Sequence, residues 1–184
     1  MTIEKPRVLL IYGSLRVGST SRALIHIAKS ILDELGAETK IFEAEGLPLF
    51  DFMEDSNRKV QELYELTKWS NAQVWCSPEF HGNMTGMFKN IIDWMPCNGG
   101  AAQSTEGKPV AVMSVTGGAQ SFNTVNNMRL VAKWIRMPVC TEQLVVPYSH
   151  DSIPDLSDTH RDRLVKLMKE LVELHNMLQF RNIA

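Results

Sequence analysis

Cysteine is scarce in this chain: its 184 residues include three, and no two of them are spaced as a C-x-x-C pair. An odd number of cysteines without paired spacing argues against both a disulfide framework and a thiolate zinc site. Cys76 and Cys140 fall in apolar stretches, where cysteine acts as a small hydrophobic residue, and the third is Cys97. We therefore expect a reducing, cytoplasmic location and no bound metal.

Long apolar runs and clusters of basic residues are also missing. The segment Met1–Arg7 is polar, and the short apolar run Val8–Tyr12 fits neither a signal peptide nor the roughly 20 apolar residues of a membrane span. The formal net charge is −2, and no basic run exceeds a couple of residues. Because binding to a phosphate backbone requires clustered lysine and arginine, we expect neither nucleic acid nor a membrane among the partners.

What the chain has instead is a regular alternation of short apolar segments with segments of helical periodicity. Apolar residues make up 44% and charged residues 22%, an ordinary globular balance, and the length suits one α/β domain over residues 1–184. The predicted strands are Arg7–Tyr12, Glu38–Glu43, Ala72–Ser77, Pro109–Val115 and Val139–Val146. The predicted helices are Ser21–Leu35, Asn57–Ser70, Gly86–Met95, Asn123–Arg136 and Asp158–Leu178. Pro78 predicts the end of the third strand.

Short buried strands that alternate with helices are typical of a parallel sheet covered on both faces. Since strand–helix–strand crossovers are right-handed, five such units predict an open, doubly wound sheet in a three-layer α/β fold. Sheets of this kind bind ligands at the carboxyl ends of the strands, where strand order reverses. The loops after the first, third and fourth strands are therefore the expected site of function.

The loop after the first strand, Gly13–Arg22, has the composition of a phosphate-binding site. It places hydroxyl side chains and one arginine just before a predicted helix, whose free N–H groups and dipole attract an anion. The candidate phosphate ligands are Ser14, Arg16, Ser19, Thr20 and Ser21. The alternative is a capping cluster, in which one of the three consecutive hydroxyl residues caps the helix whatever the function.

Two common phosphate-binding motifs do not fit this loop. In the nucleotide-binding pattern G-x-x-x-x-G-K-[ST], Ser19 occupies the position of the lysine that reaches the terminal phosphates. In the dinucleotide pattern G-x-G-x-x-G, Leu15 stands where the second glycine admits a pyrophosphate. What remains is a pocket for one phosphomonoester, which suits FMN.

Two further loops offer groups that suit an isoalloxazine ring, which has two apolar faces and a hydrogen-bonding edge. The candidates after the third strand are Pro78, Glu79, Phe80, His81 and Gly82. The candidates after the fourth strand are Thr116, Gly117, Gly118, Gln120 and Ser121. Taken singly, the first of these loops also fits a solvated polar turn, and the second a tight connection capped by Ser121 or Asn123. We interpret His81 as a hydrogen-bonding wall residue and assign it no catalytic role.

The predicted helix Gly86–Met95 carries more apolar side chains than one face of a sheet requires, among them Met87, Ile92 and Trp94. This excess predicts that the helix lies at a subunit interface. The last predicted helix, Asp158–Leu178, has a single apolar stripe and is expected to cover the sheet.

Three segments carry a resemblance to a known family: Gly13–Arg22 (GSLRVGSTSR), Pro78–Trp94 (PEFHGNMTGMFKNIIDW) and Val115–Asn123 (VTGGAQSFN). Together they resemble the NADPH-dependent FMN reductase family, and within it the arsenical-resistance flavoproteins of the ArsH type. The resemblance extends from Pro6 to about Leu178. It implies a flavodoxin-like fold with strand order 2-1-3-4-5, noncovalently bound FMN, NADPH as co-substrate, and a homodimer or homotetramer.

The resemblance also implies roles for the loop residues. The implied phosphate ligands are Ser14, Arg16, Ser19 and Ser21, with Thr20 beside them. Pro78–Gly82 would run along the isoalloxazine ring, and Gly117–Ser121 would approach its other edge.

We therefore expect an FMN-dependent oxidoreductase that takes hydride from NADPH and reduces a small acceptor by a ping-pong mechanism, with the flavin carrying the chemistry. The candidate acceptors are quinones, azo compounds, metal oxyanions, free flavins, oxygen and organoarsenicals. One alternative is a flavodoxin-type electron carrier that does not itself oxidise NADPH, against which the nearly balanced charge and Arg16 argue. Another is a binding or regulatory protein of the same fold without flavin, which would purify colourless.

Overall fold

A parallel sheet built from the apolar runs of the sequence forms the centre of the molecule. The computed structural model describes residues 4–51, 56–95, 104–119, 121–153 and 155–181. The strands are β1 (Arg7–Tyr12), β2 (Glu38–Phe42), β3 (Ala72–Phe80), β4 (Asn83–Met84), β5 (Val110–Val115) and β6 (Leu144–Val146). The helices are α1 (Thr20–Glu34), α2 (Arg58–Trp69), α3 (Gly86–Trp94), α5 (Asn123–Trp134), α6 (Ser149–Ser152) and α7 (Asp158–Arg181). Short β4 and α6 are additions to the predicted alternation.

The strands β2, β1, β3, β5 and β6 are parallel to their neighbours and follow the order β2-β1-β3-β5-β6. The short β4 lies off this path and pairs antiparallel with the end of β3. Leaving β4 aside, this is the predicted order 2-1-3-4-5, with the fourth and fifth strands labelled β5 and β6. The doubly wound α/β class is thus confirmed, and the strand order reverses between β1 and β3.

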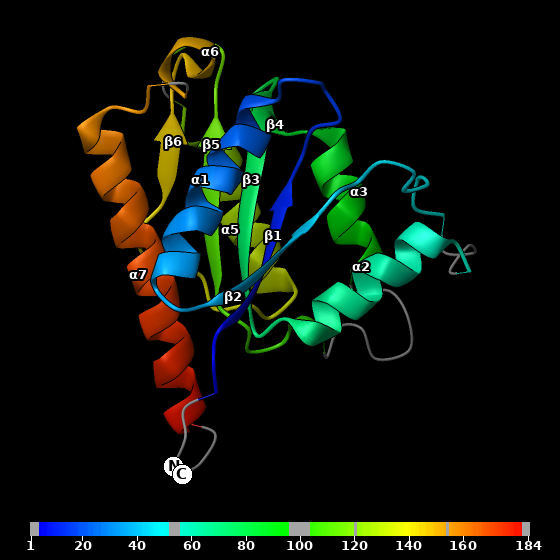
Figure 1. Ribbon diagram of the computed structural model, residues 1–184. Helices are drawn as coiled ribbons and strands as arrows, with labels where there is room; N and C mark the ends of the chain where they lie inside the picture. Colours follow the sequence, from blue (N-terminus) through cyan, green and yellow to red (C-terminus); the bar gives the residue numbers. More distant parts are fainter. Residues whose placement is uncertain (1–3, 52–55, 96–103, 120, 154, 182–184) are drawn as a thin grey trace.

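Alternate residues of each strand face opposite helical layers, as the pleat of a strand requires. In β1, Val8 and Leu10 pack in a core with α1 and α7, whereas Leu9 and Ile11 pack in a second core with α2, α3 and α5. Figure 1 shows the resulting three layers, with the sheet between the two groups of helices. All four side chains are fully buried, and each such burial stabilises the fold by about 1.5–3 kcal/mol.

β3 continues through Pro78 to Phe80, so the predicted end of this strand is wrong. The pairing of β3 with β1 ends at Cys76, whereas its pairing with β5 continues until Pro78 lies opposite Val115. Because proline lacks an N–H, it is tolerated in a strand where one side has no neighbour to accept that hydrogen bond. The extension carries Glu79 and Phe80 beyond the end of β1, into the pocket described below.

β6 is shorter than the predicted strand Val139–Val146. Val139 forms only an isolated bridge with Val110. The next residues turn to α7 instead, because the N–H groups of Thr141 and Glu142 donate to the Glu170 carboxylate at 2.6 and 2.9 Å. A side-chain acceptor from a distant helix thus replaces ladder hydrogen bonds at this edge of the sheet.

The apolar excess of α3 is buried inside the chain and does not form an outer surface. Phe88 and Trp94 are almost fully buried. Phe50 meets the Trp94 ring edge-on, with ring centroids 5.0 Å apart. Trp94 Nε1 and Asn90 Nδ2 donate to the Pro48 carbonyl at 2.9 and 2.8 Å. The segment after β2 therefore covers part of this helix, and a subunit interface on α3 stays a prediction.

Two of the cysteines fall within the described residues, and both are buried. Burial raises the pKa of the Cys76 thiol, and burial aided by Glu170 raises the pKa of Cys140 to about 12. Both thiols stay protonated at neutral pH and pack as small apolar groups. Cys97 lies outside the described residues.

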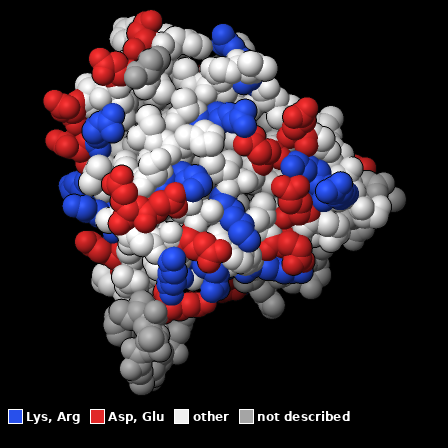
Figure 2. All heavy atoms as spheres, in the orientation of Figure 1, with Lys and Arg blue, Asp and Glu red and all other residues white. Residues whose placement is uncertain are grey.

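The surface over α1 and α7 carries lysine and arginine interspersed with aspartate and glutamate (Figure 2). On α1, Lys29 pairs with Asp33 at 2.6 Å. Exposed pairs of this kind add at most about 1 kcal/mol each, so this face is an ordinary hydrated surface. No helix in the described ranges is both long enough and apolar enough to cross a membrane.

Candidate functional site

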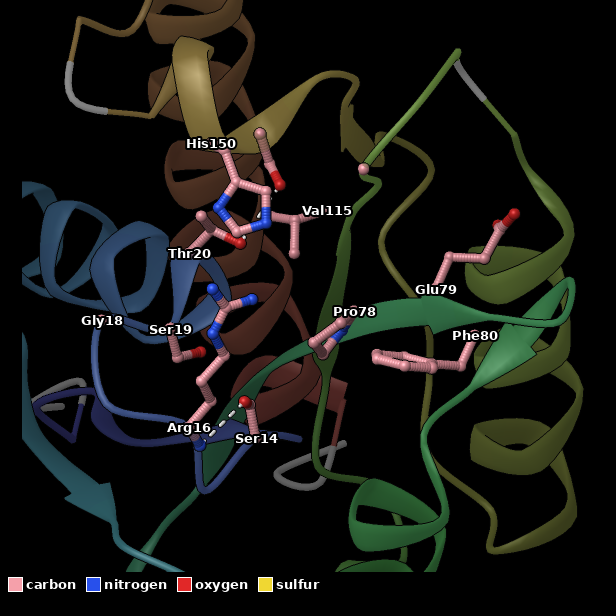
Figure 3. Close-up of a pocket in the computed structure, with 12 residues that line it drawn as sticks. Ser14, Arg16, Gly18, Ser19, Thr20, Pro78, Glu79, Phe80, Val115 and His150 are labelled. Carbon is pink, nitrogen blue, oxygen red and sulfur yellow. Dashed lines mark hydrogen bonds between the residues drawn. The ribbon is translucent and has the colours of Figure 1, made fainter.

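A pocket lies at the carboxyl ends of β1, β3 and β5, where the topology predicts a ligand site. Its lining comes from the three loops after these strands and from α6 (Figure 3). The lining residues are Ser14, Arg16, Gly18, Ser19, Thr20, Pro78, Glu79, Phe80, Val115, Gly117, Ser149 and His150. The structure therefore brings together members of all three predicted loops.

The first loop starts in close contact with α3. A Cβ atom at Gly13 would lie 2.6 Å from Cβ of Phe88 and 2.7 Å from Oγ1 of Thr85, so only glycine fits there. Thr85 Oγ1 donates to the Gly13 carbonyl at 2.7 Å. Next along the loop, Ser14 Oγ accepts a hydrogen bond from the N–H of Arg16 at 3.2 Å. These contacts hold the loop against the end of the sheet and place Arg16 at the pocket.

Ser19 caps α1, as the capping alternative proposed for one of the hydroxyl residues. Its Oγ accepts a hydrogen bond from the N–H of Arg22 at 3.2 Å and shares another with Ser21 Oγ at 2.9 Å. Ser21 is fully buried and lies outside the pocket lining, where it holds Ser19 in place. Thr20 Oγ1 accepts from Ser149 Oγ at 3.1 Å, which leaves the hydrogen of the Thr20 hydroxyl available as a donor.

Arg16 brings an unpaired positive charge to this end of the pocket. Its side chain extends along the pocket toward Thr20 (Figure 3). Within the described residues no carboxylate pairs with Arg16, whereas the nearby Arg22 pairs with Glu43 at 3.1 Å. Glu43 also accepts a hydrogen bond from Tyr12, and burial together with this carboxylate raises the pKa of the Tyr12 hydroxyl. A free guanidinium beside a helix N-terminus suits a phosphate dianion.

The other end of the pocket is flat and largely apolar. Pro78 and Phe80 line it, and the Phe80 ring extends toward Pro78 (Figure 3). Phe80 is 61% exposed, so an apolar ring surface is open at the mouth of the pocket. The Glu79 side chain extends away from Arg16 (Figure 3), and its Oε2 accepts a hydrogen bond from Thr124 Oγ1 at 3.1 Å. That bond ties the β3 extension to the first turn of α5.

His81 and Gly82 form the turn between β3 and β4 and do not line the pocket. Both have positive φ values, 50° and 73°, as a two-residue hairpin turn of the mirror-image type I′ requires. The His81 side chain is exposed. Contacts of these two residues with a flavin stay a prediction.

The β5 loop contributes Val115 and Gly117 to the lining. Thr116 turns inward, and its Oγ1 donates to the carbonyls of Gly118 and Ala119 at 3.0 and 3.2 Å, which closes the loop on itself. Among the other candidates, Gly118 accepts a hydrogen bond at its carbonyl from the N–H of Tyr148 at 3.0 Å. Ser121 Oγ accepts from the N–H of Asn123 at 3.4 Å, and Gln120 lies outside the described residues.

Ser149 and His150 line the pocket, and neither was among the predicted site residues. They follow β6, whose carboxyl end lies at the same edge of the sheet as the other loops. The N–H of Ser149 donates to the Thr116 carbonyl at 2.9 Å, which joins α6 to the β5 loop. Ligands bind at the carboxyl ends of the strands in such sheets, and applying this rule to the loop after the fifth predicted strand would have indicated these residues.

The donor set fits one phosphomonoester attached to a flat ring system. Hydroxyl groups, the Arg16 guanidinium and the N-terminus of α1 converge at one end, and no lysine is among the described lining residues to bind further phosphates. Glycine and apolar side chains line the other end. A doubly wound sheet with such a pocket at its switch point defines the class of flavodoxin-like nucleotide-binding proteins.

Comparison with known proteins gives the family. The sequence model of the NADPH-dependent FMN reductase family matches residues 6–151, so the chain belongs to that family of flavin-dependent enzymes. It is 47% identical over 176 residues to the NADPH-dependent FMN reductase ArsH of Acidithiobacillus ferrooxidans, over 94% of this chain and 74% of that protein. It is 28% identical to the NADPH azoreductase of Bacillus sp. strain OY1-2, over 90% of each chain.

A solved structure supports the same fold. The apo form of the NADH:FMN oxidoreductase EMOB superposes with a TM-score of 0.78 at 16% identity, over 92% of this chain and 89% of that chain. At this identity the likeness shows the fold alone, and the flavodoxin-like prediction is confirmed.

Proposed function

We propose that this protein is an FMN-dependent oxidoreductase that takes hydride from NADPH and reduces a small acceptor. The observation that carries the proposal is Arg16, which pairs with no described carboxylate and lies beside the hydroxyls of Ser14 and Thr20, next to an apolar wall. Such a site matches a single phosphate on a planar cofactor. Membership of a family named for FMN and NADPH supports the same assignment.

The residues of the pocket would bind and orient rather than react. Arg16, Ser14 and Thr20 would hold the phosphate, and Pro78, Phe80 and Gly117 would flank the ring. FMN, when bound, accepts a hydride from a reduced nicotinamide and passes electrons to a second substrate. NADPH and the acceptor would contact the ring at the same exposed end of the pocket in turn, which gives ping-pong kinetics.

The exposed end of the pocket at Phe80 also affects which acceptors the protein can reduce. The exposed Phe80 ring offers an apolar surface, and apolar contact does not select one functional group. We therefore propose a broad range of small oxidants: quinones, azo compounds, metal oxyanions, flavins, oxygen and organoarsenicals. The relatives named as an FMN reductase ArsH and an azoreductase are consistent with such a range.

The test is an absorbance spectrum of the purified full chain, recorded before and after anaerobic addition of NADPH. We expect a flavin band that bleaches on reduction and returns when a quinone or azo dye is added. A band that NADPH leaves unchanged would instead identify an electron carrier. A colourless protein that takes up no FMN on incubation would contradict the proposal altogether.

We infer further that the chain forms a homo-oligomer through α5. Leu130 and Trp134 lie one turn apart on this helix and are 67% and 87% exposed. Two hollows between α3 and α5 share Lys89, Leu130 and Val131, and one of them reaches Trp134. A two-fold axis beside this surface would let Trp134 of each copy fill a hollow of the other. Two adjacent, highly exposed apolar side chains favour such burial over solvation.

Replacing Trp134 with glutamate is therefore expected to raise the dissociation constant of the oligomer at least about tenfold, as for a central interface aromatic residue. Light scattering after size-exclusion chromatography would measure the mass. Met177→Glu is the matched control, because Met177 is 68% exposed on α7, away from this surface. A wild-type chain that runs as a monomer, or equal masses for both variants, would contradict the inferred interface.

A further inference from the structure

We propose that His150 is a second cationic ligand of the flavin phosphate, and that with Arg16 it makes the pocket select phosphorylated flavin over riboflavin. The proposal rests on the proposed function, since it assigns a role within that same pocket. His150 follows β6 and lies outside the three segments that carry the family resemblance.

The two basic side chains face the same space from different elements. Arg16 comes from the loop after β1, and His150 comes from α6 after β6. In Figure 3 the Arg16 guanidinium extends toward Thr20, and the His150 imidazole lies beside Thr20. The end of the pocket that holds the hydroxyl donors is thus flanked by two groups able to carry positive charge.

The backbone that carries His150 is firmly held. Ser149 is buried, its N–H donates to the Thr116 carbonyl at 2.9 Å, and its Oγ donates to Thr20 Oγ1 at 3.1 Å. The preceding residue, Tyr148, has left-handed backbone angles of φ 47° and ψ 46°. A non-glycine residue in this conformation costs about 1–2 kcal/mol, which the contacts of the segment must offset. The backbone directly before His150 is therefore held against α1 and the β5 loop.

No described carboxylate compensates these two groups. Neither side chain forms an ion pair within the described residues. Glu79 is the carboxylate that lines the pocket, but it accepts from Thr124 and extends in the other direction (Figure 3). Arg16 and the imidazole of His150 line one pocket, so an anion held there can accept hydrogen bonds from both. A phosphate dianion is an anion of this kind.

The experiment compares two ligands that differ only in the phosphate. The full chain, freed of flavin, is titrated with FMN and with riboflavin, and dissociation constants are measured from flavin fluorescence. We expect His150→Ala to weaken FMN binding about tenfold, the usual size for loss of one charge-assisted hydrogen bond. Riboflavin binding should change less than about twofold, because riboflavin has a neutral hydroxyl where FMN has the phosphate dianion and so gains no charge-assisted hydrogen bond from His150. His150→Gln, which keeps a donor without the charge, should lose less than alanine does.

The matched control is His26→Ala, the same substitution at an exposed position of α1 outside the pocket lining. It should leave both dissociation constants unchanged. Equal weakening of FMN and riboflavin by His150→Ala would assign the residue a structural role and overturn the inference, as would unchanged FMN affinity. These results would leave the proposed function intact, because the wild-type chain still binds FMN. A wild-type chain that binds neither flavin would overturn both.

Discussion

Replacing Arg16 with alanine is expected to weaken FMN binding about 100-fold, or about 2.7 kcal/mol, and to leave riboflavin affinity nearly unchanged. Arg16 is unpaired within the described part of the chain and extends along the pocket toward Thr20. Its planar guanidinium matches phosphate oxygens with two parallel hydrogen bonds, a geometry that lysine does not offer. Arg16→Lys should therefore recover only part of the affinity.

Arg22, six residues further along the chain, provides the control for this result. Arg22 carries the same charge, sits in the first turns of α1, and pairs with Glu43 at 3.1 Å instead of lining the pocket. Arg22→Ala should change FMN affinity less than about threefold, because the charge it removes is already compensated and exposed. Flavin fluorescence titration measures both variants. An equal loss in the two would mean that general positive charge, and not a ligand contact from Arg16, determines binding.

Replacing Gly13 with alanine is expected to lower the free energy of unfolding by about 2 kcal/mol and to weaken FMN binding as well. The added methyl group would lie 2.6 Å from Cβ of Phe88 and 2.7 Å from Oγ1 of Thr85. Neither atom is the end of a flexible side chain, so the loop and α3 must move apart. That movement breaks the hydrogen bond from Thr85 to the Gly13 carbonyl and displaces the start of the phosphate loop.

Gly86→Ala is the matched control for this substitution. Gly86 begins α3, one residue after Thr85, and a Cβ atom there would meet nothing within 4 Å. Because alanine favours helix more than glycine does, this variant should be as stable as the wild type or slightly more stable. Urea unfolding monitored by circular dichroism would measure both. If the two variants unfold at the same urea concentration, the close contact between the first loop and α3 is not present in solution.

Prediction from sequence succeeded where a residue's role depends on its neighbours along the chain. The run Arg7–Tyr12 is found as β1, and Pro109–Val115 as β5 with one residue fewer, because both are apolar runs buried on two faces. The hydroxyls before the first helix indicated a cap, and Ser19 provides it.

Prediction failed where the role depends on what lies beside an element. Pro78 predicted the end of a strand, yet β3 continues. Its pairing with β1 has already ended at Cys76, and only the pairing with β5 reaches Pro78. Trp94 contributed to the apolar excess of α3, yet it is buried against the segment around Pro48 within the same chain. A subunit interface on α3 stays a prediction. Exposed apolar side chains lie one turn apart on α5, at Leu130 and Trp134. Whether a side chain is buried depends on the element that packs against it, and the periodicity of one element does not identify that neighbour.

By itself, the sequence determined the alternation of strands and helices, the order in which the polar loops follow the strands, and a loop chemistry suited to one phosphate. Only the tertiary structure decided which members of those loops meet: it turned Ser14 and Arg16 to the pocket and Ser21 into the core. It also brought Ser149, 129 residues further along the chain, into hydrogen-bond contact with Thr20, and His150 with it. Local chemistry depends on adjacent residues, whereas the composition of a pocket depends on how the sheet aligns strand ends that are distant in sequence.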